Sequence, residues 1–209
     1  MDNTSDQRLA DFLYEAAMLK RTPRTGYQFL GRGRESVAEH SFGVVVISYA
    51  LAWKAREKGG SPDMEKLLKL ALFHDLPEAR TGDMNYMNKR YVSVLEDRAH
   101  ADAVRDLPFA GELEELYREW KACETLEARL AADADQLDMI LELCRHASDG
   151  CAQAGDWIGF ARKRFRTEAG RALLDAALAR DPSGWWFEKK DEYWVSPKPP
   201  EPPASGEGG

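Results

Sequence analysis

Two histidines and a group of aspartates stand at positions where they could bind a metal ion. His40 and His74 both fall on the apolar stripes of expected helices, and the whole chain has only four histidines. Asp75 follows His74 directly, and three more aspartates crowd residues 133–138. Imidazole nitrogens and carboxylate oxygens together suit a divalent transition metal such as Mn, Co, Zn or Fe. The residue types therefore predict a metal site.

The aspartates of residues 133–138 are the more telling feature, because their helix is apolar nearly all round. An unpaired carboxylate inside an apolar interior is costly, so a cation normally accompanies it. Helical periodicity does not choose among Asp133, Asp135 and Asp138. At this point the choice of aspartate stays open.

Helical periodicity predicts the elements that must position these side chains. Expected helices cover residues 11–20, 36–58, 64–75, 112–146 (one long or broken helix), 157–164 and 168–180. Ser36 and Glu39 have the spacing of a capping box, and Pro77 disfavours a helical Leu76, which places His74 and Asp75 at a helix end. No stretch alternates with a period of two for long enough to predict a sheet. The fold class expected is all-α.

Length and composition restrict the function. A chain of 209 residues with 44 % hydrophobic and 31 % charged residues fits a globular domain. A net charge of −7 argues against a nucleic-acid polymer as partner. No apolar run approaches the roughly 18 residues of a membrane span, and the N-terminus lacks the pattern of a signal peptide. Three cysteines without CxxC spacing fit a reducing compartment, so we expect a cytoplasmic protein.

The order His40, His74-Asp75, Asp135 resembles the H…HD…D pattern of the HD-domain metal-dependent phosphohydrolases. Three stretches, Ser36–Ser41, His74–Glu78 and Thr81–Asp83, are similar to the 5′-deoxynucleotidase subfamily, which includes a bacterial enzyme and eukaryotic relatives. A bare HD pair is a weak motif, whereas HD-x-P-E-x-x-x-G-D with an upstream EH is specific. The resemblance covers about residues 8–145, and it includes Leu19–Gly26, which looks like the subfamily's first-helix segment.

This resemblance implies a role for individual residues. It implies a divalent ion (Mn, Co, Mg, Zn or Fe) and the ligands His40, His74, Asp75 and Asp135. Asp135 is chosen because the family's last ligand precedes a segment like Gln136–Leu141. Glu78 and Asp83 match the second acidic pair, assigned to proton transfer and water positioning or to a second cation. Arg21 matches a phosphate-contacting arginine.

The activity implied is that of a phosphoric monoester hydrolase, most closely a 5′-nucleotidase. It would convert (deoxy)nucleoside 5′-monophosphates, or another small phosphate ester, to the alcohol and phosphate. The expected organisation is an HD domain in residues 1–150, a helical C-terminal extension in 151–196 and a disordered tail in 197–209. Several HD phosphohydrolases are dimers, so a homodimer is also an expectation.

Some positions depart from the subfamily pattern. Thr22 stands where the bacterial enzyme has a tryptophan associated with recognising deoxyribose, and Met84–Tyr91 replaces the usual continuation after Gly82-Asp83. These departures affect the expected sugar and base preference but leave the metal ligands unchanged. The family does not account for Trp185–Phe187, which we interpret as a packing flap, with a substrate lid or a dimer contact as the alternatives.

Two alternatives remain beside the phosphomonoesterase. A two-iron HD oxygenase or cyclic-nucleotide phosphodiesterase needs extra histidines between the HD pair and the last aspartate. Only His100 is available there, within a charged stretch, Glu96–Asp102, that resembles a solvated surface. A non-catalytic regulatory module with a structural metal would not need Glu78, Asp83 or Arg21.

Overall fold

The computed structural model describes residues 3–187, whose regular elements are all helices apart from one isolated β-bridge between Pro23 and Ser36. This confirms the all-α fold class. The α-helices are α1 (Asn3–Ala17), α2 (Val37–Glu57), α3 (Met64–Phe73), α4 (Glu78–Thr81), α5 (Glu96–Val104), α6 (Ala110–Ala122), α7 (Leu126–Ser148), α8 (Ala152–Ala161) and α9 (Glu168–Leu178). Short 3-10 helices are η1 (Met18–Lys20), η2 (Thr25–Leu30), η3 (Asn88–Arg90) and η4 (Arg162–Arg164). The tail predicted at 197–209 and the last part of the extension, 188–196, lie outside the described residues.

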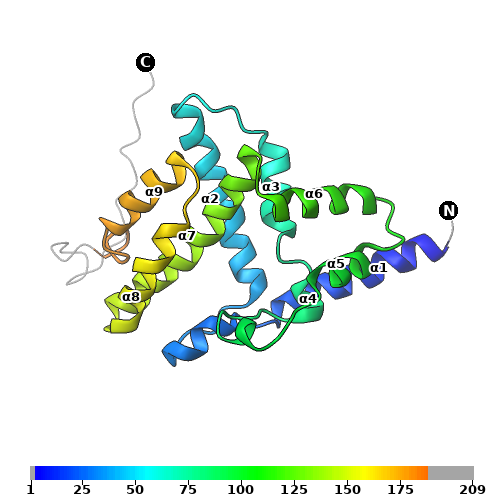
Figure 1. The fold of residues 1–209 in the computed structure, drawn as a ribbon, viewed down its shortest axis with the longest axis horizontal. Helices are drawn as coiled ribbons and strands as arrows, with labels where there is room; N and C mark the ends of the chain where they lie inside the picture. The colour runs from blue at the N-terminus through cyan, green and yellow to red at the C-terminus, as the bar shows by residue number, and fades with distance from the viewer. Residues whose placement is uncertain (1–2, 188–209) are drawn as a thin grey trace, which may run out of the picture.

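Helices α2, α3 and α7 form the centre of the molecule, and the others pack around them (Figure 1). Helices α8 and α9 lie on one side of this centre, whereas α1, α4, α5 and α6 lie on the other. Leu51, Leu67, Leu130 and Ile140 are completely buried where the three central helices meet. The two helices that carry His40 and the aspartates are thus held by the main hydrophobic core. No helix in the described part of the chain combines the length and apolarity needed to cross a membrane.

The start of α2 and the end of α3 follow from local sequence signals. The Glu39 amide donates to Ser36 Oγ at 3.2 Å, and the Ser36 amide donates to Glu39 Oε2 at 2.7 Å, which confirms the predicted capping box. Helix α3 ends at Phe73, two residues earlier than expected, so His74 and Asp75 lie just beyond its last turn. His40 therefore lies in the first turn of α2, and His74 lies at the C-terminal end of α3.

The stretch expected as one long or broken helix over residues 112–146 is two helices, α6 and α7. Cys123 adopts a left-handed conformation with φ of 50°, which ends α6. The Thr125 side chain then caps α7 by accepting a hydrogen bond from the Ala128 amide at 3.2 Å. The break allows α6 to turn away from α7.

Two sequence interpretations are corrected by the structure. His100 is only 3 % exposed on α5 and stacks on Tyr117 with ring centroids 4.1 Å apart, so it does not belong to a solvated surface. The sequence neighbours of His100, Asp97 and Arg98, are exposed, which is why composition misassigned His100. Trp185 is 85 % exposed, so its ring does not pack as the expected flap requires.

Asp133 connects α7 to the start of α9. Its side chain is completely buried and accepts hydrogen bonds from the Arg166 amide at 2.7 Å, the Thr167 amide at 2.9 Å and the Thr167 hydroxyl at 2.6 Å. A Cβ on Gly170 would lie 2.2 Å from Asp133 Oδ2, so the close approach of α9 requires glycine there. The Asp133 carboxylate therefore holds the start of α9 against α7.

Replacing Asp133 by alanine should lower the free energy of unfolding of metal-free protein by about 2 kcal/mol, because it leaves buried amides without an acceptor. Urea unfolding in excess chelator measures this loss. Asp135→Ala is the matched control on the same helix, because Asp135 accepts no backbone amide in the described structure. An equal loss of stability in the two variants would contradict the assignment of Asp133.

Candidate metal centre

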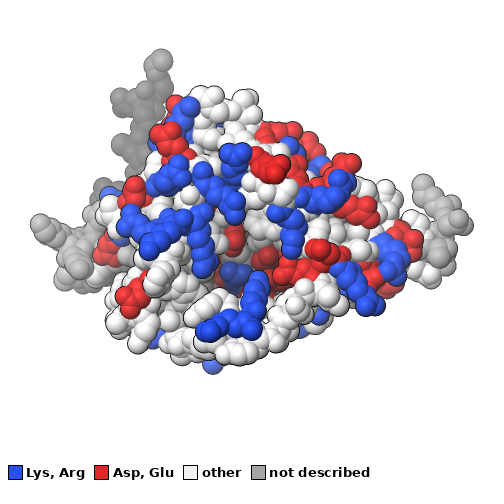
Figure 2. All heavy atoms as spheres, in the orientation of Figure 1, with Lys and Arg blue, Asp and Glu red and all other residues white. Residues whose placement is uncertain are grey.

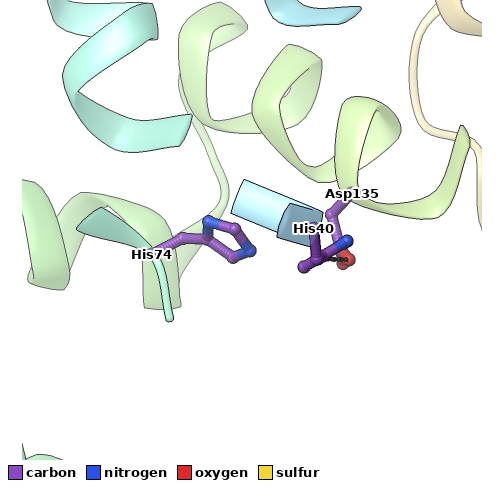
Figure 3. A group of neighbouring side chains, drawn as sticks. All are labelled: His40, His74 and Asp135. Atoms are coloured by element: carbon purple, nitrogen blue, oxygen red, sulfur yellow. Dashed lines mark ion pairs between the residues drawn. The ribbon is translucent and has the colours of Figure 1, made fainter. Parts of the chain in front are cut away.

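Three helical segments bring two histidines and one aspartate together. His40 lies in the first turn of α2, His74 directly follows α3, and Asp135 lies on α7. Their potential ligand atoms all lie within 4.8 Å of one another. Figure 3 shows the two imidazoles and the Asp135 carboxylate converging from different elements, with the His40–Asp135 pair marked. His40 Nε2 lies 3.2 Å from Asp135 Oδ1.

Asp75 completes the set of four ligands expected from the sequence. Its Oδ2 atom lies 3.0 Å from His74 Nε2 and 3.7 Å from His40 Nε2. Asp75 therefore lies beside both histidines, whereas the group whose potential ligand atoms all lie within 4.8 Å of one another is His40, His74 and Asp135, from positions up to 95 residues apart. An ion held there would have two nitrogen donors and two carboxylates, a set that suits a divalent metal.

Hydrogen bonds orient both imidazole rings with Nε2 toward this point. His40 Nδ1 lies 2.7 Å from Asp138 Oδ2, and His74 Nδ1 lies 2.8 Å from the Ala71 carbonyl oxygen. Both Nε2 atoms are buried and make no hydrogen bond within the described structure. A buried nitrogen without a partner is costly. Because a metal ion would satisfy both atoms at once, these residues fit a resident metal.

The carboxylates of Asp135 and Asp138 favour a positive charge at His40. Burial alone would lower the pKa of His40, but the carboxylates of Asp135 and Asp138 outweigh it and raise this pKa to about 10. His40 and Arg24 in turn help to hold the pKa of the buried Asp135 carboxyl below its usual range, against the opposing effect of burial. In metal-free protein the His40 ring thus carries a proton between two carboxylates. A divalent ion would supply the same positive charge more directly.

A second group of potential ligands, Glu35, His40 and Asp138, lies behind the first. His40 Nδ1 is already engaged by Asp138, so this group supports the ring and does not offer a separate site. Burial, followed by the charge of Asp138, raises the pKa of Glu35 to about 7. A Cβ on Gly43 would lie 1.9 Å from Asp138 Oδ1, so only glycine lets α2 come this close to Asp138.

Arg24 lies beside the candidate metal ligands, at the wall of the adjoining cavity. Its Nη1 atom lies 3.7 Å from Asp75 Oδ2 and 3.9 Å from Asp83 Oδ1. Burial works against its charge, but Asp75, Asp135 and Asp83 outweigh burial and raise the pKa of Arg24. The Thr25 amide donates to Asp83 Oδ2 at 2.5 Å, and the Thr25 hydroxyl lies 3.2 Å from the same oxygen. Asp83 therefore fixes the backbone beside Arg24.

Arg21, the arginine expected to contact phosphate, is exposed and is absent from the residues that line the pocket. Arg24 lines that pocket instead. Sequence reasoning did not single out Arg24, because both arginines lie in the same Gly- and Arg-rich connection. The hydrogen bond between the Thr25 amide and Asp83 holds the backbone next to Arg24 at the cavity. It joins residues 58 positions apart, so the sequence alone does not show which arginine faces the cavity.

A cavity of about 1020 Å³ opens on the centre. Acidic, basic and aromatic side chains share its wall, among them His74, Asp75, Glu78, Asp135, Arg24, Lys89, Lys121 and Trp120. Figure 2 shows acidic side chains inside a hollow of this face, with lysines and arginines on either side of it. The cavity wall therefore combines carboxylates with basic side chains, although the chain as a whole is acidic.

Asp138→Ala should weaken divalent-metal affinity by about 10- to 100-fold without abolishing binding, because Asp138 orients His40 but is not itself a ligand. Calorimetric titration of metal into chelator-treated protein checks this. Asp138→Glu, which keeps a carboxylate at the position, is the conservative control. An affinity unchanged in the alanine variant would show that the His40–Asp138 contact does not orient the ring.

Three comparisons bear on this site. The family model described as HD domain matches residues 16–173. The 5′-deoxynucleotidase hdd1 of Schizosaccharomyces pombe is 28 % identical over 153 residues, covering 68 % of this chain and 74 % of that protein. The 5′-deoxynucleotidase HDDC2 of Dictyostelium discoideum is 31 % identical over 140 residues, covering 63 % of this chain and 74 % of that protein.

A solved structure is also similar to this chain. The PH0347 protein from Pyrococcus horikoshii is 34 % identical and superposes with a TM-score of 0.69, covering 81 % of this chain and 96 % of that one. The family match includes His40, the His74-Asp75 pair and Asp135, together with all the helices that position them. This protein belongs to the HD-domain family.

Proposed function

We propose that this protein is a metal-dependent phosphomonoesterase that hydrolyses (deoxy)nucleoside 5′-monophosphates to the nucleoside and phosphate. The observation that carries this proposal is the close approach of two buried imidazole Nε2 atoms and the Asp75 and Asp135 carboxylates, with Arg24 beside them, at one end of the cavity. The names of the relatives, 5′-deoxynucleotidases, support the nucleotide as substrate class.

The metal would be held by His40, His74, Asp75 and Asp135. When bound, a divalent ion at this point would lower the pKa of a bound water and offset negative charge on the phosphate. Its identity is proposed only as one of Mn, Co, Mg, Zn or Fe: imidazole ligands suit Zn and Fe, whereas carboxylates suit Mn and Mg.

Arg24 is proposed to bind the phosphate in place of Arg21. It already lies against Asp75, so its guanidinium is held next to the ligand set. A guanidinium can donate two parallel hydrogen bonds to phosphoryl oxygens and orient the group. Its Asp83 partner, tied to Thr25, keeps the arginine in place before the substrate arrives.

Glu78 and Asp83, the predicted catalytic pair, are proposed to have different tasks. The Asp83 carboxylate is committed to Thr25 and therefore acts as a positioning group. Glu78 Oε2 is buried without a hydrogen-bond partner in the described structure, and Glu78 lines the cavity. Burial, with the charges of Asp75 and Asp83, raises the pKa of Glu78 to about 9, so its carboxyl holds a proton in metal-free protein. That proton suits transfer to the leaving 5′-oxygen.

The alternatives gain little support from the site. A two-iron centre needs further histidines, and among the described residues neither His100 nor His146 joins a group able to hold a metal. A purely structural metal would not need a cavity of about 1020 Å³ or an arginine beside the ligands. The homodimer and the cytoplasmic location stay predictions.

The test is phosphate release from a panel of deoxy- and ribonucleoside 5′-monophosphates by metal-stripped protein supplied with each candidate metal. We expect turnover that depends on the metal and that falls to background in His74→Ala, because this change removes a ligand. Urea unfolding of the variant without metal is the control for folding. Turnover that survives in folded His74→Ala, or a wild-type protein inert with every metal, would overturn the proposal.

The paired variants Arg24→Ala and Arg21→Ala separate the two candidate phosphate contacts. Removing a group that stabilises phosphoryl charge should lower kcat/KM by about 100-fold in Arg24→Ala. The exposed Arg21 should be replaceable with a change of about twofold or less. Steady-state kinetics on one monophosphate measures both, and the reverse order of effects would restore Arg21 as the contact.

A further inference from the structure

The two carboxylate oxygens of Asp135 have different partners. Oδ1 lies 3.2 Å from His40 Nε2, at the candidate metal centre. Oδ2 accepts a hydrogen bond from the Gln136 side-chain nitrogen at 2.9 Å. Asp135 and Gln136 both line the cavity. One oxygen is thus turned toward the other ligands, and a neutral donor holds the second.

The helical segment that follows α7 supplies the group that holds Gln136. Arg164 of η4 donates from Nη1 to Gln136 Oε1 at 3.2 Å. Because a guanidinium only donates hydrogen bonds, the oxygen of the Gln136 amide must face Arg164, which leaves the NH2 group for Asp135. Neighbouring positions on an α-helix point about 100° apart, so Gln136 must bend back to reach Asp135. An anchor for its oxygen favours that bent conformation.

The backbone around η4 is fixed against α7 independently of the arginine side chain. The Arg166 amide donates to Asp133 Oδ1 at 2.7 Å, and Asp133 lies three positions before Gln136 on α7. Phe165, which follows Arg164 directly, is buried. Arg164 is therefore brought to Gln136 by a segment whose docking has its own contacts.

We propose that Gln136 and Arg164 are positioning residues for the metal ligand Asp135. Arg164 holds Gln136, and Gln136 holds Oδ2, so that Oδ1 is the oxygen offered to the metal. This inference rests on the metal centre of the proposed function and not on which phosphate ester is hydrolysed. It makes η4 part of the metal centre, although all four proposed ligands precede η4 in the chain.

Charge alone predicts the opposite effect for Arg164. A guanidinium near a cation site repels the metal, so its removal would tighten metal binding if Arg164 acted only through its charge. Loss of a group that orients a ligand weakens metal binding instead. The sign of the change in metal affinity in Arg164→Ala therefore separates the two roles.

The test is titration of Co²⁺ into protein freed of metal by a chelator and dialysed, followed by calorimetry and by the visible absorption of the bound ion. Gln136→Ala should raise the Kd for Co²⁺ by about 10- to 100-fold. Arg164→Ala should raise it by about 3- to 10-fold, the effect of one hydrogen bond. Arg164→Lys, which can still donate to Gln136 Oε1, should recover most of that loss.

Arg162→Ala is the matched control. Arg162 has the same charge and lies in the same short helix, but its Nη2 atom lies 3.5 Å from Asp175 Oδ1. Its removal should change the Kd by about twofold or less. A loss of affinity equal to that in Arg164→Ala would mean that the charge of η4, and not the contact with Gln136, is responsible, and would overturn the inference.

The double variant Gln136→Ala/Arg164→Ala tests whether Arg164 acts through Gln136. If it does, adding Arg164→Ala to Gln136→Ala should change the Kd by about twofold or less. A further loss as large as in the wild-type background overturns the inference, and so does an unchanged or lower Kd in either single variant. Urea unfolding of the metal-free variants detects a merely structural role, which predicts lost stability with an unchanged Kd.

These affinities are independent of turnover. Wild type that binds Co²⁺ but releases no phosphate contradicts the proposed activity, and the Kd values still decide the positioning roles. Turnover in wild type with unchanged Co²⁺ affinity in both single variants contradicts the positioning roles alone. Wild type that binds no Co²⁺ overturns this inference together with the proposed metal centre.

Discussion

Three aspartates of α7, one buried and two half-buried, govern how the neighbouring helices are arranged. An apolar interior does not tolerate unpaired charge, so each aspartate must meet a partner from another element. Asp133 receives the amides that precede α9, Asp135 faces His40 Nε2, and Asp138 binds His40 Nδ1. Because these partners come from α2 and from the start of α9, satisfying α7 also determines where its neighbours pack.

The same requirement links architecture to chemistry. His40 lies between two carboxylates, which orient its ring and favour positive charge at that point. Gly43 on α2 and Gly170 on α9 provide the close approach that each aspartate needs, since a Cβ at either position would overlap with a carboxylate oxygen. A metal ion at the centre therefore completes an electrostatic arrangement that the helix packing has already built.

Sequence patterns predicted several local features, although α4 and α5 were not among the expected helices. The all-α class, the capping box of Ser36 and Glu39 and the approximate extent of α2, α3 and α9 followed from periodicity and from short-range hydrogen bonding. The break after Cys123 was harder to locate, because a left-handed residue other than glycine leaves no composition signal. His100 was misassigned because its charged sequence neighbours mask a buried contact with Tyr117, a residue from another helix.

By itself the sequence determined the helices and the short list of nitrogen and oxygen donors, because helix signals are local and the family pattern is linear. Only the tertiary structure decided which of these donors lie close together. It separated Asp135 from Asp133 and Asp138, turned Arg24 and not Arg21 toward the cavity, and brought Arg164 to Gln136. These choices depend on contacts between segments far apart in the chain, such as Thr25 with Asp83, and no local pattern encodes which distant group will be present.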